Sequence, residues 1–300
     1  MRLSVIVNPF AGGGRAGRNL EVVQAELTRL GLEHRVQTTR SLEHARELAV
    51  EATGMGEVAV AFGGDGLIGA IADALKHSDG VLGVLPGGRG NDFARGLGIS
   101  VEPSAACEVL AKGQVCELDL GKVGARTFIG IASCGFDSVA NRIANETTLV
   151  RGNLVYAYGA LRALAGWKPA TFTVAADGQA TRTITGYTVA AANSKAYGGG
   201  MYMAPDASLT DGLLDVVIVG SERKLRFLRG LPTVFRGEHI HQPNVEVLRC
   251  RSLHIDASRP FTLYADGDPI AELPVTIETL PRAVRAIVPP ASDGSDGAAR

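Results

Sequence analysis

Three glycine-rich turns in the first half of the chain carry many of the residues that could do chemistry. They read AGGGRAG (11–17), FGGDG (62–66) and LPGGRGND (85–92), and each follows a short apolar run. Glycines let backbone N–H groups approach phosphate oxygens, and the start of a following helix favours negative charge. Any tight turn can use glycine, so the three turns together, rather than one alone, indicate a nucleotide or phosphate ligand.

The common nucleotide motifs do not fit these turns. Gly12-x-Gly14-x-x-Gly17 has the spacing of a dinucleotide fingerprint, which also needs an acidic residue about 20 positions further on to hold the ribose. The next strand ends in Thr38-Thr39-Arg40, with no carboxylate. A Gly-x4-Gly-Lys-Ser/Thr motif is absent as well. The turns therefore predict a nucleotide site of neither common kind.

Carboxylates follow several of the predicted strands. Asp65 lies between glycines, and Asp92 follows Asn91 in the third turn. A solvated loop position is the ordinary role of Asp65, and the Asn91-Asp92 pair could cap a helix beginning at Phe93. Asp65 or Asp92 could also hold a Mg²⁺ ion that bridges phosphates, since Mg²⁺ prefers oxygen ligands. Asp266-Gly267-Asp268 reads locally as a hairpin turn.

Short apolar runs and helical patterns alternate in the first 120 residues. This alternation predicts an α/β domain with a parallel sheet covered by helices on both faces. Ligands of such sheets bind at the carboxyl ends of the strands. Strands are expected at Leu3–Val7, 34–38, Val58–Phe62 and Val81–Leu85, and helices at Leu20–Leu30, after a Ser41 cap, at Leu67–Leu75 and after Asp92.

Beyond residue 120 short strands dominate and predict a β-sandwich domain. We expect domains at 1–120 and 121–288 and a disordered tail at 289–300. Helices are expected at Leu154–Leu164 and Glu222–Phe235. The expected strands are Phe128–Ser133, Thr171–Ala175, Tyr187–Ala192, Leu214–Val219, Leu253–Ala257, Phe261–Ala265, Val275–Thr279 and Val284–Val288.

Composition narrows the class of protein. The 300 residues carry a formal net charge of −1, which predicts no nucleic-acid partner. The four cysteines match no zinc pattern. No signal peptide and no apolar run of ~18 residues is visible, so we expect a cytoplasmic protein. The basic helix expected at Glu222–Phe235 predicts transient contact with the inner membrane face.

The motifs occur together in an order that resembles the bacterial diacylglycerol kinase family of soluble lipid kinases, which are related to sphingosine and ceramide kinases. The similarity extends from Val5 to about Val288. The motifs are Gly63-Gly64-Asp65-Gly66, Leu85–Ala94, Asn193-x6-Gly200, Ala204-Pro205-Asp206-Ala207, Asp211–Asp215 and Asp266-Gly267-Asp268.

The resemblance implies a nucleotide domain and a β-sandwich with the active site in a cleft between them, and transfer of the ATP γ-phosphoryl group to a lipid hydroxyl. It implies ATP and Mg²⁺ as cofactors and a lipid alcohol as substrate. Asp266 matches the general base. Asn8, Thr39, Gly63, Gly64, Asp65, Gly66, Gly88, Arg89, Asn91 and Asp92 fall at the nucleotide. Asp211, with the carbonyls of Ser208 and Leu213, matches a structural magnesium site.

The chain departs from the family pattern in three places. Leu67, Ile68, Gly69 and Ala70 replace the usual Thr-x-Asn-Glu after GGDG. Arg89 replaces a threonine and could supply positive charge to phosphate. Asp268 replaces the usual glutamate.

Two other functions stay open at this stage. One is a kinase of a soluble acceptor such as NAD, whose enzymes share GGDG but whose Asn-Glu pair is absent at Gly69-Ala70. The other is a non-catalytic nucleotide or lipid sensor, which the lost polar residues after GGDG favour. The acceptor lipid and the oligomeric state are not readable, and a homodimer is compatible with the sequence.

Overall fold

A computed structural model describes residues 1–147 and 154–290. The chain forms two compact units, one from Met1–Leu118 and the end of the last strand from Val284 onward, the other from Asp119–Ala283. The last strand was expected wholly in the second domain, so its return to the first unit differs from the predicted ranges 1–120 and 121–288. In the described ranges, no helix is long and apolar enough to cross a bilayer.

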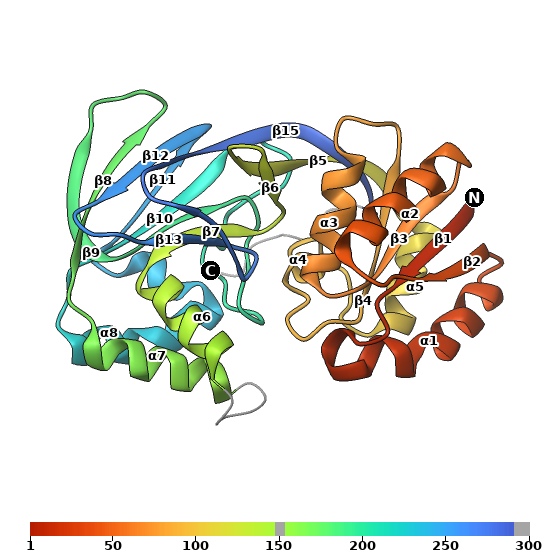
Figure 1. Cartoon of the computed structure of the whole chain (residues 1–300), viewed down its shortest axis with the longest axis horizontal. Helices are drawn as coiled ribbons and strands as arrows, with labels where there is room; N and C mark the ends of the chain where they lie inside the picture. Colours follow the sequence, from red (N-terminus) through yellow and green to blue (C-terminus); the bar gives the residue numbers. More distant parts are fainter. Residues whose placement is uncertain (148–153, 291–300) are drawn as a thin grey trace, which may run out of the picture. The chain divides into compact units, whose positions relative to one another are not determined.

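The first unit contains the predicted parallel sheet (Figure 1). Its strands are β1 (Arg2–Val7), β2 (Glu33–Thr38), β3 (Val58–Gly63) and β4 (Val81–Pro86), in the order β4-β3-β1-β2. The end of β15 (Val275–Val288) runs parallel to β4. Every residue of β3 is buried, as expected for a strand with both faces covered. All four strands predicted for this unit are confirmed.

Helices cover both faces of this sheet (Figure 1), which confirms the predicted fold class. Helices α2 (Leu42–Gly54) and α3 (Asp65–Leu75) pack together, as do α1 (Ala11–Arg29) and α5 (Pro103–Lys112), while α4 (Asp92–Gly96) is short. The Ser41 hydroxyl accepts the His44 N–H at 3.0 Å and caps α2 as predicted. The sequence reasoning missed α5.

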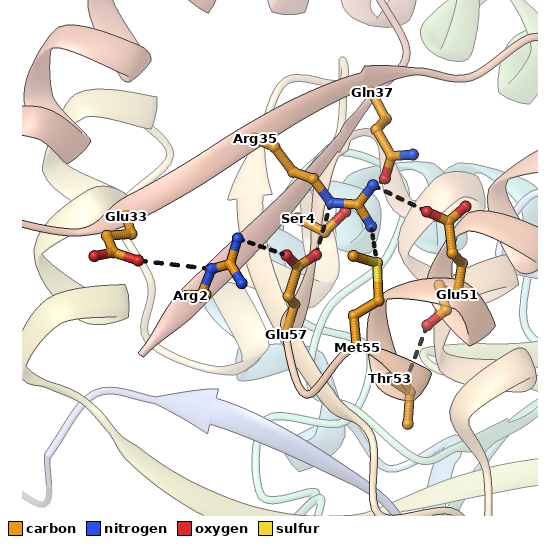
Figure 2. A network of polar contacts seen from close by, with 10 residues as sticks. Arg2, Ser4, Glu33, Arg35, Gln37, Glu51, Thr53, Met55 and Glu57 are labelled. Carbon is orange, nitrogen blue, oxygen red and sulfur yellow. Dashed lines mark hydrogen bonds and ion pairs between the residues drawn. The ribbon is translucent and has the colours of Figure 1, made fainter.

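A polar network fixes one end of the sheet (Figure 2). The Glu57 side chain is 1% exposed and accepts the Arg35 Nε–H at 2.7 Å. Arg35 also pairs with Glu51 at 2.9 Å, and Arg2 lies 3.8 Å from Glu57. Because a buried carboxylate needs a partner, these arginines tie β1 and β2 to the segment between α2 and β3.

The second unit is dominated by antiparallel strands around a large apolar core. They form the order β14-β13-β7-β9-β8-β12-β15, with β10 beside β9 and β11 beside β10. Phe172, Tyr187, Leu253 and Leu263 are among the core side chains. The strands are β5 (Gln114–Val123), which begins in the first unit, β6 (Arg126–Phe128), β7 (Ile131–Gly135), β8 (Ala170–Ala176), β9 (Arg182–Ala192), β10 (Leu214–Gly220), β11 (Val245–Cys250), β12 (Ser252–Ala257), β13 (Thr262–Ala265), β14 (Asp268–Glu272) and β15.

Four of the elements expected in the second half of the chain differ in the structure. The predicted strand Phe128–Ser133 is interrupted at Ile129-Gly130, and the two last predicted strands are one strand, β15. The predicted helix Glu222–Phe235 is wrong. Helix α8 (Lys224–Gly230) ends early and continues as the 3₁₀ helix η1 (Leu231–Arg236), followed by η2 (Glu238–His241), because Pro232 cannot donate an α-helical hydrogen bond.

Two helices pack as a pair at one side of this unit (Figure 1). They are α6 (Phe136–Glu146) and α7 (Leu154–Gly166). Helix α7 confirms the helix expected at Leu154–Leu164, whereas α6 was missed. Most of the predicted disordered tail at 289–300 lies outside the described residues.

Candidate active site

The three glycine-rich turns pack against one another at the carboxyl edge of the first unit's sheet. A Cβ at Gly88 would lie 2.4 Å from the Gly64 Cα, and a Cβ at Gly12 would lie 2.5 Å from the Gly87 carbonyl oxygen. The Gly87 N–H also donates to the Gly63 oxygen at 2.7 Å. The turns therefore meet backbone to backbone, and only glycine fits at these contacts.

Other glycines of the same turns have open space around them. Nothing lies within 4 Å of a Cβ built on Gly13 or Gly66. Gly13 adopts a left-handed φ of 70°, whereas Gly66 lies in the first turn of α3. Helix α3 starts at the GGDG turn with Gly64 as its N-cap. Its N-terminus presents the positive end of the helix dipole at this edge.

Asp65 and Asp92 come together in this region. A Cβ at Gly90 would lie 2.9 Å from an Asp92 carboxylate oxygen and 3.3 Å from Asp65 Oδ2. Asp65 Oδ1 accepts the Phe93 N–H at 3.0 Å. The cap of α4 therefore comes from Asp65 in the preceding turn. The prediction that the Asn91-Asp92 pair caps this helix is wrong for Asn91, which stands at the N-cap position without a side-chain cap bond.

Three predicted nucleotide residues use their side chains within the protein. Buried Asn91 holds the third turn, because its Oδ1 accepts the Gly88 N–H at 2.8 Å and its Nδ2 donates to the Gly88 oxygen at 3.2 Å. The Thr39 hydroxyl donates to the Ser41 oxygen at 2.6 Å. Asn8 Oδ1 accepts the Phe10 N–H at 3.1 Å. These residues shape the turns that surround the site.

Exposed arginines follow the same strand ends. Arg15 lies in the first turn, Arg40 follows β2, and Arg89 lies in the third turn. Within residues 1–147 and 154–290, none of the three pairs with an acidic side chain. Their charges are available to an anion at this edge, as expected for a phosphate site.

The apolar residues after GGDG belong to the core. Leu67 is 3% exposed and Ile68 is 0% exposed, both on the buried face of α3. These positions are therefore filled by packing and offer no polar group to a ligand.

Asp266 lies at the turn between β13 and β14 and binds three backbone N–H groups. Its Oδ2 accepts from Ile129 at 2.8 Å, and its Oδ1 accepts from Gly130 at 2.9 Å and Ile131 at 3.3 Å. A Cβ at Gly130 would lie 2.5 Å from Asp266 Oδ1, so glycine is required there. Asp266 therefore closes the break between β6 and β7, a structural role that its sequence motif did not reveal. Asp268, two residues on, is exposed.

Sequence reasoning missed one further carboxylate, Asp137, in the first turn of α6. Burial raises the pKa of this carboxyl, and its Oδ1 accepts the Thr188 hydroxyl at 3.2 Å. Its Oδ2 is buried without a partner among the residues that the structure describes. The position directly after a buried strand, Ile131–Gly135, was the signal that could have identified it.

A cationic side chain from β11, Arg249, lies against the predicted magnesium loop. Asp211 Oδ1 accepts the Leu213 N–H at 3.0 Å, and its Oδ2 lies 3.5 Å from Arg249 Nη2. Arg249 also donates to buried Asp215 at 3.1 Å. The Ser208 hydroxyl bonds to Thr210 at 3.2 Å. The described residues contain no group of three or more acidic, His or Cys side chains placed to hold a metal ion. One carboxylate with two carbonyls suits Mg²⁺ chemically, but Arg249 already neutralises that carboxylate.

Family models of known proteins match both structural units of the chain. The family "Diacylglycerol kinase catalytic domain" matches residues 2–123, and "YegS C-terminal NAD kinase beta sandwich-like domain" matches residues 130–288. A diacylglycerol kinase from Mycobacterium tuberculosis is 31% identical over 96% of this chain and 95% of its own length. One from Bacillus subtilis is 29% identical, with 96% of each chain covered.

Solved structures show the same architecture. A putative diacylglycerol kinase from Bacillus anthracis has a TM-score of 0.80 at 24% identity and covers 97% of this chain and 98% of its own. An NAD kinase from Archaeoglobus fulgidus, solved with ATP, has a TM-score of 0.51 at 16% identity, with 96% of this chain and 93% of its own covered. The fold is thus that of a two-domain kinase. The chain belongs to the diacylglycerol kinase family of lipid kinases.

Proposed function

We propose that the protein transfers the γ-phosphoryl group of ATP to the hydroxyl of a lipid alcohol, with diacylglycerol as the first acceptor to test. The observation that carries this proposal is the 31% identity to a diacylglycerol kinase over nearly the full length of both chains. The catalytic-domain family also matches the unit in which the three glycine turns meet.

The nucleotide phosphates would bind at the carboxyl edge of the first unit's sheet. Support comes from the open backbone at Gly13 and Gly66, the start of α3, and the exposed Arg89, which has no acidic partner among the described residues. Phosphoryl transfer depends mainly on positioning and charge neutralisation, which these groups supply. Asp65 and Asp92, whose carboxylates converge, are the residues that would hold a Mg²⁺ ion, and that ion would neutralise charge on the phosphates.

Asp266 is the proposed proton acceptor for the lipid hydroxyl. Its three N–H bonds hold the carboxylate in one orientation. A positioned base is typically worth about 10²–10⁴ in rate. Asp268 is the alternative acceptor, because it is exposed on the same turn and takes the place of the family's glutamate.

A lipid-phosphorylation assay with radiolabelled ATP tests the function. Mixed micelles containing diacylglycerol, a total lipid extract, and NAD are the three acceptors, each with and without Mg²⁺. We expect Mg²⁺-dependent label in a lipid product that mass spectrometry identifies. Label in NAD alone would favour the soluble-acceptor kinase, and tight ATP binding with no labelled product from any acceptor would favour a sensor.

The substrate lipid resides in a bilayer, so we also propose transient contact through α8 and η1. Leu225 is 60% exposed and Phe235 is 55% exposed, and Arg223 and Arg229 lie on the same short segment. Exposed apolar side chains beside basic ones favour anionic membrane surfaces. The remainder of the segment is structural, since Phe227 stacks on Tyr187 with a centroid distance of 3.9 Å.

Vesicle sedimentation tests this contact. We expect binding to vesicles that contain phosphatidylglycerol, and weaker binding after Arg223→Gln with Arg229→Gln or after Leu225→Asn. Unchanged sedimentation in both variants would reject this surface.

A further inference from the structure

A single guanidinium group contacts the loop that precedes β10. We call residues 206–213 the acidic loop, because Asp206 and Asp211 lie in it and Asp215 follows it as the second residue of β10. The acidic loop has no basic residue of its own. Strand β11 pairs antiparallel with β10, and its Arg249 stands directly opposite Asp215 in the register. The pairing of the two strands therefore brings a cation to the acidic loop.

Arg249 contacts three different acidic residues. Its Nε–H donates to Asp215 Oδ1 at 3.1 Å, and its Nη2 donates to the backbone oxygen of Asp206 at 3.1 Å. The same Nη2 lies 3.5 Å from Asp211 Oδ2. The Asp215 side chain is 3% exposed, so the first contact is buried, whereas the Asp211 and Arg249 side chains are 27% and 45% exposed. One planar fork therefore joins the acidic loop to β10 at several points.

Both oxygens of the Asp211 carboxylate already face protein groups. Oδ1 accepts the Leu213 N–H at 3.0 Å, and Oδ2 faces Arg249. A Mg²⁺ ion bound to this carboxylate would lie beside the guanidinium group, and the two positive charges would repel each other. The predicted ligand set, Ser208, Asp211 and Leu213, is therefore unsuited to a metal ion while Arg249 is in place.

A second protein group, Asp119 of β5, also anchors the acidic loop. Asp119 is fully buried, and its Oδ2 accepts the Gly212 N–H at 2.7 Å while its Oδ1 accepts the Arg282 N–H at 2.7 Å. Its own N–H donates to the Leu209 oxygen at 2.7 Å. Because these bonds fix the backbone on both sides of Asp211, that carboxylate is held in reach of Arg249.

We infer that the Arg249 guanidinium takes the place of a structural metal ion in this chain, so that the acidic loop is held without Mg²⁺. A guanidinium stays charged throughout the usual pH range, and a chelator does not remove it. Any Mg²⁺ requirement of the protein then lies with the nucleotide phosphates, whose proposed carboxylates, Asp65 and Asp92, belong to the other unit. The inference goes beyond the proposed function and does not rest on it, because the loop is held in this way whether or not the protein transfers phosphate.

Hydrogen exchange of the acidic loop tests the inference in the full chain without nucleotide. Mass spectrometry follows peptides that contain Gly212 and Leu213, whose N–H groups donate to carboxylates. The wild-type protein is compared in EDTA, in excess Mg²⁺ and in excess Ca²⁺, and we expect the same exchange rate in all three. A metal ion bound in the loop would stabilise it and slow its exchange. Slower wild-type exchange in Mg²⁺ that Asp211→Asn abolishes would overturn the inference.

Variants of Arg249 decide whether its guanidinium holds the acidic loop. In EDTA, Arg249→Ala should speed exchange of the loop roughly tenfold, as expected for loss of one hydrogen bond between charged groups. Arg249→Lys retains the charge without the planar fork and should give an intermediate rate. Arg251→Gln changes an exposed arginine two residues further along the chain, is the matched control, and should exchange as the wild type does. Thermal unfolding verifies that each variant is folded.

Metal addition to Arg249→Ala tests whether the guanidinium and a metal ion are equivalent. Removing the guanidinium takes its charge away from Asp211 and Asp215, so Mg²⁺ or Ca²⁺ should bind there and slow the exchange again. The Arg249→Ala/Asp211→Asn double variant should lose this rescue. Wild-type exchange of Arg249→Ala in EDTA, or fast exchange that neither metal ion slows, would overturn the inference.

Discussion

Replacing Asp266 by asparagine should damage stability as well as activity. The wild-type carboxylate accepts N–H groups on both oxygens, with distances of 2.8, 2.9 and 3.3 Å. Asparagine tolerates the left-handed φ of 52° at this position, so the backbone itself is not strained. Its amide, however, has only one oxygen. Its NH₂ group must therefore face either the Ile129 N–H or the Gly130 and Ile131 N–H groups, and one or more of these donors loses its acceptor.

The size of the loss follows from these contacts. A hydrogen bond to a charged group contributes about 1.5–3 kcal/mol, and an unsatisfied buried donor costs about 1–3 kcal/mol. We therefore expect Asp266→Asn to lower the free energy of unfolding by about 2–4 kcal/mol. At about 2–4 °C per kcal/mol, the second unit should melt roughly 4–16 °C lower. Differential scanning calorimetry measures this shift.

Asp268→Asn is the matched control, because it removes a carboxylate from the same turn at an exposed position. Its stability should change by less than about 0.5 kcal/mol. Turnover of both variants is then measured at a temperature where both are folded. Loss of kcat only in Asp266→Asn supports Asp266 as the base, and loss only in Asp268→Asn transfers that role to Asp268. Wild-type melting of Asp266→Asn would refute the structural reasoning.

Three further predictions address the rest of the chain. Glu57→Gln should lower the free energy of unfolding in urea by about 1–3 kcal/mol, since it removes the charge of the buried carboxylate that Arg35 contacts while Arg35 keeps Glu51, whereas Glu33→Gln, at an exposed pair, should cost less than about 1 kcal/mol. Burial lowers the pKa of His239, so the unfolded chain binds the proton more readily. The urea midpoint should therefore fall as the pH drops below about 6.5, and His239→Gln should reduce that dependence. Gly88→Ala should destabilise by about 1–3 kcal/mol through its clash with Gly64, whereas Gly66→Ala should not destabilise and should weaken ATP binding. Calorimetry and nucleotide titration check that pair.

The first unit could be predicted because its signals are local. Each buried strand is a short apolar run followed by a glycine turn, and both features are readable without knowledge of the fold. The second unit was harder. Helix α6 follows β7 directly at Gly135-Phe136. Its N-cap residue is a glycine, so the sequence has no polar cap residue that would predict the start of this helix. The break at Ile129-Gly130 exists because a carboxylate more than a hundred residues away binds these N–H groups.

The same limit applies to the site residues. Sequence motifs selected Asp65 and Asp92, whose carboxylates lie near one another; their role at a nucleotide stays a prediction. The motifs could not distinguish side chains that stabilise the turns from side chains that are free to contact a ligand. That distinction depends on the hydrogen-bond partner of each side chain, which only the fold determines. Asn91 and Thr39 bond within the protein, whereas Arg89 has no acidic partner in the described ranges. The contact of Arg249 with Asp211 could not be predicted either, because Arg249 lies on β11, far from Asp211 in the sequence.

Two separate constraints explain the glycines of the three turns. One is close packing between the turns, and the other is access of a ligand to the backbone. Gly12 and Gly88 are needed where the turns touch, since an added Cβ would lie 2.5 Å or less from backbone atoms of a neighbouring turn. This requirement would hold in a protein that bound no nucleotide. Gly13 and Gly66 meet no atom within 4 Å, so packing does not explain them. Gly13 still needs its left-handed φ, whereas α3 would tolerate alanine at Gly66. Gly66 is therefore the position at which the absence of a side chain most directly indicates the approach of a phosphate.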